Sequence, residues 1–193
     1  KTLIVGGAKL SNDLKSKLTK LQTTVYETFG MTETVSHIAV KEIRESSSLF
    51  EVLPSVSVGV DARNCLTINA PHLVSKPIQT NDVVKLNSRT TFEWLGRYDN
   101  IINSGGIKIN PEQLEHQLEG FIKERFFITA QKDNSLGEIV VIVIERSTPF
   151  ETLNFDVLEP IKRPKRMYYL DRFMETVSGK IKRQETFNLI KPE

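Results

Sequence analysis

The chain has 193 residues, 39% of them hydrophobic and 26% charged, with a formal net charge of +2. This composition is typical of a folded globular protein and excludes a disordered or fibrous chain, and so small a charge gives no argument for nucleic-acid binding. The single cysteine, Cys65, excludes a disulfide framework and favours a reducing cytoplasm. The scattered histidines lack metal-ligand spacing, and no apolar run has the roughly 20 residues of a membrane span.

The N-terminal residues have the pattern of an α/β unit. The β-branched run Thr2–Val5 predicts a strand that begins at once and ends at Gly6-Gly7. Leucines at helical spacing between 10 and 21 predict an amphipathic helix, and residues 23–28 predict a second strand. Two loops therefore follow the carboxyl ends of strands, where open α/β sheets bind ligands. Because the strand pattern starts directly, we expect the chain to continue a longer protein whose N-terminal part precedes it.

The middle of the chain, from about residue 38 to Gly96, has a β pattern. Short alternating runs are separated by turn residues, at 56–60, 65–69, 83–86 and 91–95. They predict a small, strongly bent β-sheet or barrel attached to the α/β unit. The triplet Thr80-Asn81-Asp82 comes just before the predicted strand 83–86, so Asp82 is expected at the start of that strand; the alternative is a turn at Asn81-Asp82.

The stretch Gly96–Pro111 is predicted to be a domain boundary. It holds the charged residues Arg97 and Asp99 and the glycine pair Gly105-Gly106. We expect residues 1–97 to form one domain and 98–193 a second, mobile α+β domain, with a hinge near Asp99. The predicted fold class is therefore α/β followed by α+β.

The second domain is expected to begin with a helix. Asn110 is its predicted cap, with Pro111 at the first helical position. The six aliphatic residues 139–144 predict a strand covered on both faces. Residues 126–130 are apolar, and the remaining elements expected are a helix at 150–158, a strand at 167–170, a loop at 177–180 and a final helix at 184–190.

The heptapeptide Thr28–Thr34 offers groups for a nucleotide. Thr32 has a hydroxyl for a phosphate oxygen, and Glu33 has a carboxylate of the kind that Mg²⁺ prefers. The aromatic ring of Phe29 suits either a base or the core. The alternative interpretation is a turn with a capping threonine, and for this heptapeptide alone it is the more common outcome.

Two further positions suit ribose or phosphate. A carboxylate such as Asp82 can accept two hydrogen bonds from a ribose diol, although Asn-Asp is also a common turn pair. Arg97 presents a fixed fork of donors, although a surface pair with Asp99 would contribute little stability.

The loop Val177–Arg183 presents Lys180 after Gly179. A lysine at this position can offset the repulsion between a phosphate and a carboxylate as they react. The alternative is a solvated basic loop. The loop is not a Walker A motif, because no glycine lies five residues before Gly179 and Ile181 stands where Ser or Thr is needed.

Together these motifs resemble the adenylate-forming superfamily of acyl- and aryl-CoA synthetases. The resemblance covers the whole chain in order, with Gly-Gly, Phe-Gly-Met-Thr-Glu, Thr-Asn-Asp, Gly-Arg-Tyr-Asp-Asn-Ile-Ile-Asn-Ser-Gly-Gly and Ser-Gly-Lys-Ile-Lys-Arg. Within it, the pattern is most similar to the o-succinylbenzoate–CoA ligases of menaquinone synthesis. It implies that residues 1–97 are the C-terminal part of the large nucleotide- and acyl-binding domain, and that 98–193 are the small mobile domain.

The resemblance also implies roles for individual residues. Those implied at the nucleotide and acyl site are Gly6, Gly7, Ala8, Phe29 for adenine stacking, Gly30, Thr32 for the α-phosphate, Glu33 for Mg²⁺, and Asp82 and Arg97 for ribose. Asp99 matches the hinge, Gly105 and Gly106 match the glycines beside the pantetheine channel, and Lys180 matches the lysine of adenylation. The chain departs from the family where Phe29 replaces tyrosine and Asn81 replaces glycine. The family's upstream phosphate loop has no match in this sequence.

The implied activity is that of an ATP-dependent, AMP-forming acid–CoA ligase. ATP, Mg²⁺ and coenzyme A are the implied cofactor and co-substrates, and a carboxylic acid, o-succinylbenzoate, is the implied substrate. The implied partner is the N-terminal part of the same enzyme, with a homodimer left open, and we expect the isolated chain to be inactive. The alternatives are another acyl- or aryl-CoA synthetase, or a non-catalytic binding module.

Overall fold

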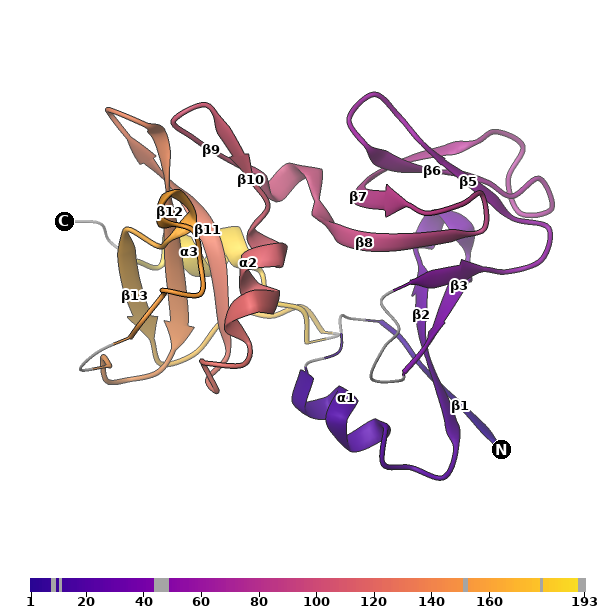
Figure 1. Ribbon diagram of the computed structural model, residues 1–193, viewed down its shortest axis with the longest axis horizontal. Helices are drawn as coiled ribbons and strands as arrows, with labels where there is room; N and C mark the ends of the chain where they lie inside the picture. The colour runs from indigo at the N-terminus through magenta and orange to yellow at the C-terminus, as the bar shows by residue number, and fades with distance from the viewer. Residues whose placement is uncertain (8–9, 11, 44–48, 151–152, 178, 191–193) are drawn as a thin grey trace. The chain divides into compact units, whose positions relative to one another are not determined.

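The computed structural model describes residues 1–7, 10, 12–43, 49–150, 153–177 and 179–190. The chain divides into two compact units, Lys1–Tyr98 (unit 1) and Asp99–Glu193 (unit 2), shown in Figure 1. The division falls one residue beyond the predicted boundary between 97 and 98. Within the described residues, none of the helices has the length and apolar character needed to span a membrane.

Unit 1 is built on one eight-stranded sheet. Its strand order is β1-β2-β3-β4-β8-β7-β6-β5. The strands are β1 (Thr2–Val5), β2 (Thr24–Gly30), β3 (His37–Glu42), β4 (Phe50–Val52), β5 (Ser57–Val60), β6 (Cys65–Asn69), β7 (Ile78–Leu86) and β8 (Thr91–Arg97). Residues of β3 through β8 share one hydrophobic core that includes Ile38, Phe50, Leu66 and Phe92. Because six strands bury side chains in the same core, the sheet is strongly bent, as the sequence predicts.

The predicted α/β unit forms the beginning of this sheet. β1 and β2 pair in parallel, with Val5 opposite Glu27, and α1 (Asn12–Leu18) connects them. Leu10 and Leu18 pack with Val25 and Ile43. The helix is shorter than the leucine spacing suggests, and Leu21 lies beyond it with 49% of its surface exposed.

The predicted start of the strand 83–86 is wrong, because Thr80-Asn81-Asp82 already lie inside β7 and do not form the alternative turn. Asp82 is opposite Arg97 of β8, and the register shifts between Val83 and Val84. The β-branched Thr80 suits a strand, and its hydroxyl donates to the Leu66 carbonyl in β6 (2.9 Å). Contacts with neighbouring strands therefore override the local turn preference.

Unit 2 contains a five-stranded sheet with β12 in the middle. Its strands are β9 (Ile102–Ser104), β10 (Ile107–Ile109), β11 (Phe126–Asp133), β12 (Gly137–Glu145) and β13 (Arg166–Leu170). The order is β10-β9-β12-β11, and β13 also pairs with β12. The aliphatic run in β12 is buried on both faces, as predicted, because alternate residues enter two hydrophobic clusters. β11 is the last strand of this order, so its outer edge has no strand partner among the residues that the structure describes.

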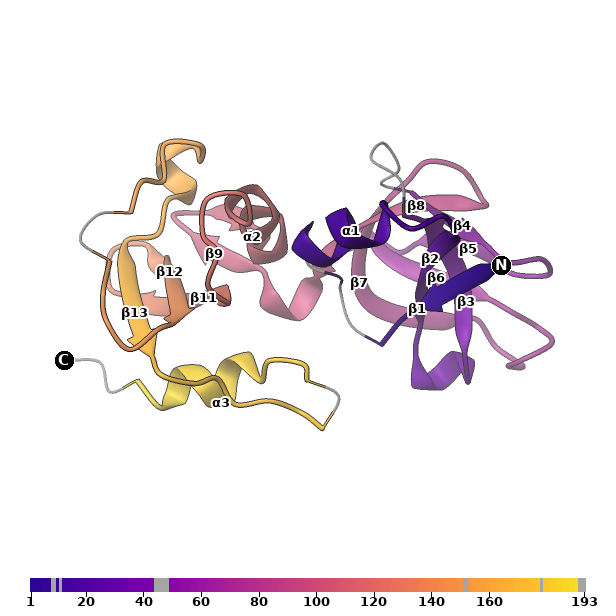
Figure 2. The same cartoon turned by 90° about the horizontal axis from the view of Figure 1, so that it is seen from below.

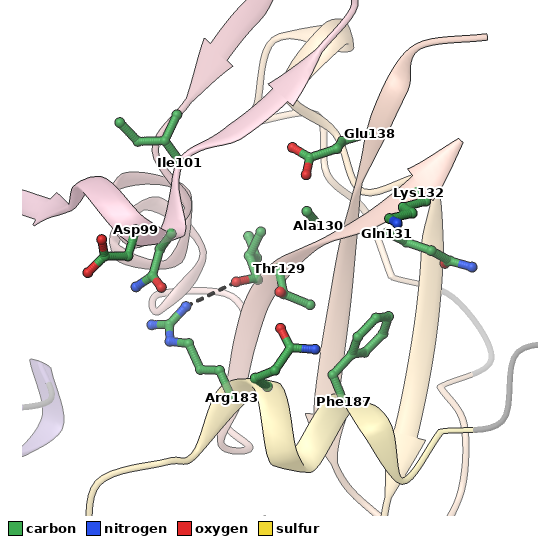
Figure 3. Close-up of a pocket in the computed structure, with 12 residues that line it drawn as sticks. Asp99, Ile101, Thr129, Ala130, Gln131, Lys132, Glu138, Arg183 and Phe187 are labelled. Carbon is green, nitrogen blue, oxygen red and sulfur yellow. Dashed lines mark hydrogen bonds between the residues drawn. The ribbon is translucent and has the colours of Figure 1, made fainter. Parts of the chain in front are cut away.

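The two helices of unit 2 cover opposite faces of the sheet. α2 (Pro111–Leu118) begins at the predicted cap, where Asn110 accepts the Glu112 N–H (3.1 Å). It packs against Ile128 and Ile142. α3 (Arg183–Asn188) lies on the other face, where Phe187 joins the cluster of Phe127 and Val143. The close-up in Figure 3 and the turned view in Figure 2 show α3 running beside the strands.

The helix predicted at 150–158 is not formed among its described residues, 150 and 153–158. Asn154 accepts the Asp156 N–H through its side-chain oxygen (2.7 Å), and such bonds compete with helix formation. Leu153 and Phe155 still pack against the core of α2 and β12. The apolar residues thus reflect burial of an irregular segment rather than a helical face.

Candidate nucleotide and thioester site

The loops after β1 and β2 lie together in unit 1. A Cβ at Gly6 would lie 2.1 Å from the Thr28 hydroxyl oxygen, so a larger residue could not approach β2 this closely without displacing that side chain. Gly7 follows with a φ of 101°, which favours glycine. The two predicted ligand loops are therefore adjacent, at the carboxyl ends of parallel strands. Ala8, predicted to belong to the first loop, lies outside the described residues.

The second loop is ordered by a threonine that the prediction did not single out. Thr34 is buried, accepts the Met31 N–H (3.1 Å) and lies within donating distance of the Met31 and Ser36 carbonyls. The turn η1 (Thr32–Thr34) leaves Thr32 and Glu33 exposed. Gly30 is required at its start, because a Cβ there would lie 2.5 Å from the Ser36 carbonyl oxygen.

Phe29 packs within the core of unit 1. Its ring centroid lies 5.6 Å from that of Phe50 and 5.3 Å from that of Phe92. This agrees with the core alternative for its ring. The ring is only partly buried, so the predicted stacking on adenine stays a prediction.

Asp82 and Arg97 are brought together by the β7–β8 register. The Arg97 guanidinium lies 3.8 Å from the Asp82 carboxylate, and the Trp94 indole N–H donates to the other carboxylate oxygen (2.9 Å). Asp82 is 8% exposed, whereas the Arg97 side chain is 45% exposed. The buried carboxylate is thus oriented from within the sheet, and the guanidinium extends into solvent beside it.

Arg63 reinforces this region and was not predicted. Its guanidinium donates to the Asn81 side chain (3.0 Å) and to the Thr80 carbonyl (3.1 Å). It also pairs with Asp61 (2.8 Å) and lies 5.0 Å from the centre of the Tyr98 ring. The asparagine that departs from the family pattern therefore has a local role as a partner of Arg63.

The glycine pair predicted beside the pantetheine channel forms a hairpin turn in unit 2. Gly105 and Gly106 connect β9 and β10 with φ values of 56° and 82°, a conformation that favours glycine at both positions. The Gly105 N–H donates to the Leu136 carbonyl (2.9 Å). Both glycines are exposed, so the turn presents its backbone at the surface.

Lys180 lies in a second hairpin, which is formed by residues 174–177 and 179–182 and which we call the Lys180 hairpin. The Thr176 N–H donates to the Lys180 carbonyl (2.9 Å), and the Lys180 N–H donates to the Thr176 hydroxyl (3.1 Å). Gly179 has a φ of 78°, so glycine is favoured before the lysine. The lysine is exposed. Ser178, part of the motif, lies outside the described residues.

A cleft of about 370 Å³ runs along the outer edge of β11 in unit 2. Its lining includes the predicted hinge residue Asp99 and side chains from β11 and α3, among them Thr129, Gln131, Arg183 and Phe187 (Figure 3). Asp99 is exposed. Across the described residues, no group of three His, Cys, Asp or Glu side chains is placed to hold a metal ion.

The structure therefore assembles the predicted residues in groups within each unit. Gly6, Gly30 and Thr32 belong to adjacent loops, and Asp82 pairs with Arg97. Trp94 was missed because its indole reaches Asp82 only across a strand pair. Arg183 was quoted only as part of a motif, although it is half-buried and pairs with the buried Glu115, 68 positions away.

Comparison with known proteins identifies relatives along the whole chain. An acyl-CoA synthetase (AMP-forming)/AMP-acid ligase II-like protein from Dyadobacter fermentans is 35% identical, with 97% of this chain and 57% of that chain covered and a TM-score of 0.52. The 2-succinylbenzoate–CoA ligase of Lactococcus lactis is 27% identical over 206 residues, which are 95% of this chain and 46% of that protein. The chain is homologous to AMP-forming CoA ligases.

The fold is that of the C-terminal portion of adenylate-forming ligases. An o-succinylbenzoate coenzyme A synthetase from Bacillus subtilis, solved with ATP and magnesium ion, has a TM-score of 0.81 at 18% identity, with 97% of this chain and 46% of that chain covered. No protein-family model matches the chain. The chain spans about half the length of the curated 2-succinylbenzoate–CoA ligase it matches.

Proposed function

We propose that this chain belongs to an acid–CoA ligase that works through an acyl-adenylate. The observation that carries the proposal is the similarity to a 2-succinylbenzoate–CoA ligase over 95% of the chain. The grouping of the motif residues supports it. Adjacent loops, a buried carboxylate beside a guanidinium, and a lysine on an exposed hairpin are the parts that such a two-step reaction needs.

The nucleotide is held by unit 1. Asp82 has one carboxylate oxygen on Trp94 and retains lone pairs for a ribose hydroxyl. Arg97 is exposed enough to contact the ribose or a phosphate. The exposed Thr32 hydroxyl contacts the α-phosphate, and Gly6, Gly7 and Gly30 allow the nucleotide to approach the backbone.

Glu33 fits a magnesium ion that arrives with ATP. Its carboxylate is exposed on η1 beside Thr32, and Mg²⁺ is commonly bound by one or two carboxylates together with substrate phosphates. A set of several acidic side chains is therefore not needed. The ion supplies neutralisation of the phosphate charge.

The first half-reaction joins the acid to AMP. A carboxylate oxygen attacks the α-phosphorus of ATP, and the bond to pyrophosphate breaks. Lys180 places a positive charge near the two reacting anions and offsets their repulsion. In the second half-reaction the CoA sulfur attacks the acyl carbonyl after losing its proton, and AMP leaves. The Gly105-Gly106 turn lines the path of the thiol because its exposed backbone leaves room for a narrow chain.

A rotation near Asp99 exchanges the two half-reactions. The division of the chain between Tyr98 and Asp99 supports a pivot there. Replacing Asp99 by proline restricts φ and removes a backbone donor, so we expect Asp99→Pro to slow one half-reaction more than the other. Single-turnover measurements of each step test this, and unchanged rates in both would refute the hinge.

We further infer that the acid is o-succinylbenzoate. The support is the extent of similarity, because 2-succinylbenzoate–CoA ligases match over 90–96% of this chain, whereas mitochondrial acyl-CoA synthetases match over 54–62%. In this reading the product is the CoA thioester used in menaquinone synthesis.

The decisive experiment is a CoA-thioester assay of the complete gene product with a panel of acids. The panel contains o-succinylbenzoate, benzoate, medium-chain fatty acids and malonate, with ATP–pyrophosphate exchange measured in parallel. We expect o-succinylbenzoate to give the highest kcat/KM. Preference for a fatty or simple aryl acid would reject o-succinylbenzoate as the substrate but agree with the ligase activity. Absence of ATP–pyrophosphate exchange with every acid would reject the ligase activity itself. The isolated chain is expected to show no exchange.

A further inference from the structure

We propose that Arg183 is a positioning residue for the adenylation step. It fixes the Lys180 hairpin to α2 across the open edge of β11. This role rests on the proposed function, in which Lys180 acts on the reacting phosphate. It concerns a residue that lies three positions after that lysine and whose side chain points towards β11 (Figure 3).

Arg183 forms a two-pronged pair with Glu115 of α2. One guanidinium nitrogen donates to Glu115 Oε1 (2.6 Å), and the other donates to Oε2 (2.8 Å). Glu115 is 8% exposed. Burial raises the pKa of the Glu115 carboxyl, while Arg183 and the Ile128 N–H oppose this by stabilising the carboxylate. Such fork-to-fork geometry fixes the direction of both side chains.

The pair also takes the place of a neighbouring strand at the edge of β11. The Ile128 N–H donates to Glu115 Oε1 (2.7 Å), and the Ile128 carbonyl accepts from Arg183 (3.0 Å). Both backbone groups of this edge residue are therefore satisfied by side chains from two helices on opposite faces of the sheet. α3 cannot shift along β11 without breaking the bonds that Arg183 makes to Glu115 and to the Ile128 carbonyl.

A short stretch of chain connects this pair with Lys180. The Lys182 N–H donates to the Met174 carbonyl (2.8 Å), and the Met174 N–H donates to the Thr186 hydroxyl (3.1 Å). Thr186 is fully buried in α3. The base of the Lys180 hairpin is thus bonded to α3 and follows the position that Arg183 sets for that helix.

The same network reaches the hinge segment. The Asn100 side chain donates to Glu112 Oε1, and Arg183 lies 4.0 Å from that carboxylate oxygen. Asn100 directly follows the proposed pivot, Asp99. The lysine and the start of unit 2 are therefore tied to one charge network, formed by two buried glutamates and the half-buried Arg183. This network lets a rotation at the hinge carry the Lys180 hairpin as a rigid part.

The test uses Arg183→Met in the complete ligase, with Lys182→Met as the matched control. Lys182 is a similar distance from Lys180 in sequence, but its exposed side chain pairs only locally with Glu185 (2.9 Å). We expect Arg183→Met to lower kcat for acyl-adenylate formation by about 10- to 100-fold, because misplacement by about 1 Å can cost that much. The KM for ATP should change less than about 3-fold. The rate of thioester formation from supplied acyl-adenylate should also change less than about 3-fold.

Two companions keep the test interpretable. Arg183→Met leaves Glu115 buried without its cation, so the double variant Glu115→Gln/Arg183→Met is measured too. All assays are run at a temperature well below the unfolding midpoint of the least stable variant. Arg183→Lys restores the charge without the fork and should recover adenylation only in part. Amide hydrogen exchange at Thr176, Gly179 and Lys180 should rise about 10-fold in the double variant, with β12 unchanged.

The outcomes separate this inference from the proposed function. Unchanged amide exchange in the Lys180 hairpin of the double variant would overturn the positioning role. A loss of kcat for adenylate formation in Lys182→Met as large as that in Arg183→Met would overturn it as well. Equal losses in both half-reactions would show a purely structural residue and would also overturn it. A wild-type protein without adenylate formation would reject the proposed function. In that case a rise in exchange in the double variant would still support the link between Arg183 and the Lys180 hairpin.

Discussion

Asp82 in unit 1 and Lys180 in unit 2 are held in contrasting ways. Asp82 lies inside a strand, is 8% exposed and is oriented by Trp94 and Arg97 through strand register. Lys180 is exposed in a hairpin, and the bonds that fix its backbone lead back to the ion pair of Arg183 with Glu115 in another part of the unit. The first is positioned by the sheet itself, and the second by side chains at a distance.

This difference matches the tasks that we propose for the two residues. A ribose-binding carboxylate serves the nucleotide best if its direction is preset, because preorganisation lowers the entropy lost on binding. A lysine that must enter and leave a site needs an exposed position on a firm base. The contrast predicts that changes near Asp82 act through nucleotide affinity, and that changes near Lys180 act through one chemical step.

The largest expected effect is that of Lys180→Ala in the complete ligase. Loss of a charge aimed at a developing anion typically costs about 100- to 1,000-fold in kcat, so adenylate formation should fall by that factor. Thioester formation from supplied acyl-adenylate should stay nearly unchanged. Single-turnover assays measure both steps, with Lys182→Ala as control. Equal loss of both steps would remove the distinction between the two residues.

Asp82→Ala comes next and acts on binding. A hydrogen bond to a charged group contributes about 1.5–3 kcal/mol, so the KM for ATP should rise about 10- to 100-fold while kcat at saturating ATP falls much less. Initial-rate kinetics test this against Glu51→Ala, which removes an exposed carboxylate from β4 of the same sheet. A fall in kcat alone would contradict a binding role for Asp82.

Gly30→Ala tests whether the backbone itself shapes the loop of Thr32 and Glu33. The added Cβ would lie 2.5 Å from the Ser36 carbonyl oxygen and 2.6 Å from His37 Cα, so we expect a loss of about 1–3 kcal/mol of stability. Trp94 is the sole tryptophan of the chain, and its fluorescence during urea unfolding reports on unit 1. Gly120→Ala, with nothing within 4 Å of the added Cβ, should have little effect.

The smallest effect is expected at Asp133 in the β11–β12 turn, far from the candidate residues in sequence. Hydrogen bonds from the Ser135 hydroxyl and from the Leu136 and Ser135 N–H groups lower the pKa of Asp133. Its stabilisation is therefore present above the ordinary carboxyl pKa of about 3.9 and is lost as the pH falls through the lower folded value.

Asp133→Ala should accordingly speed amide exchange in β11 and β12 at pH 7. The loss of stability in unit 2 should be smaller than the loss that Gly30→Ala causes in unit 1. The difference from wild type should shrink towards low pH. Asn134→Ala, in the same turn, is the control. A difference that grows as the pH falls would contradict the assigned role of the carboxylate.

Much of the local structure could be predicted because its causes are local. Asn110 and Pro111 start α2 as expected, since one supplies a side-chain acceptor and the other has a suitable φ. The unbroken aliphatic run in β12 indicated burial on both faces. Predictions failed where partners came from elsewhere, as at Thr80, drawn into β7 by neighbouring strands, and at Asn154, whose own hydrogen bonds replace a helical turn.

The sequence by itself determined which chemical groups are available and in what order, including the glycines whose backbone conformations only glycine readily adopts. The tertiary structure alone decided which of them meet. Asp82 faces Arg97 because of strand register, and Arg183 reaches Glu115 because two helices cover opposite faces of one edge strand. Neither contact leaves a local pattern, since both depend on chain segments that become neighbours only when the sheets form.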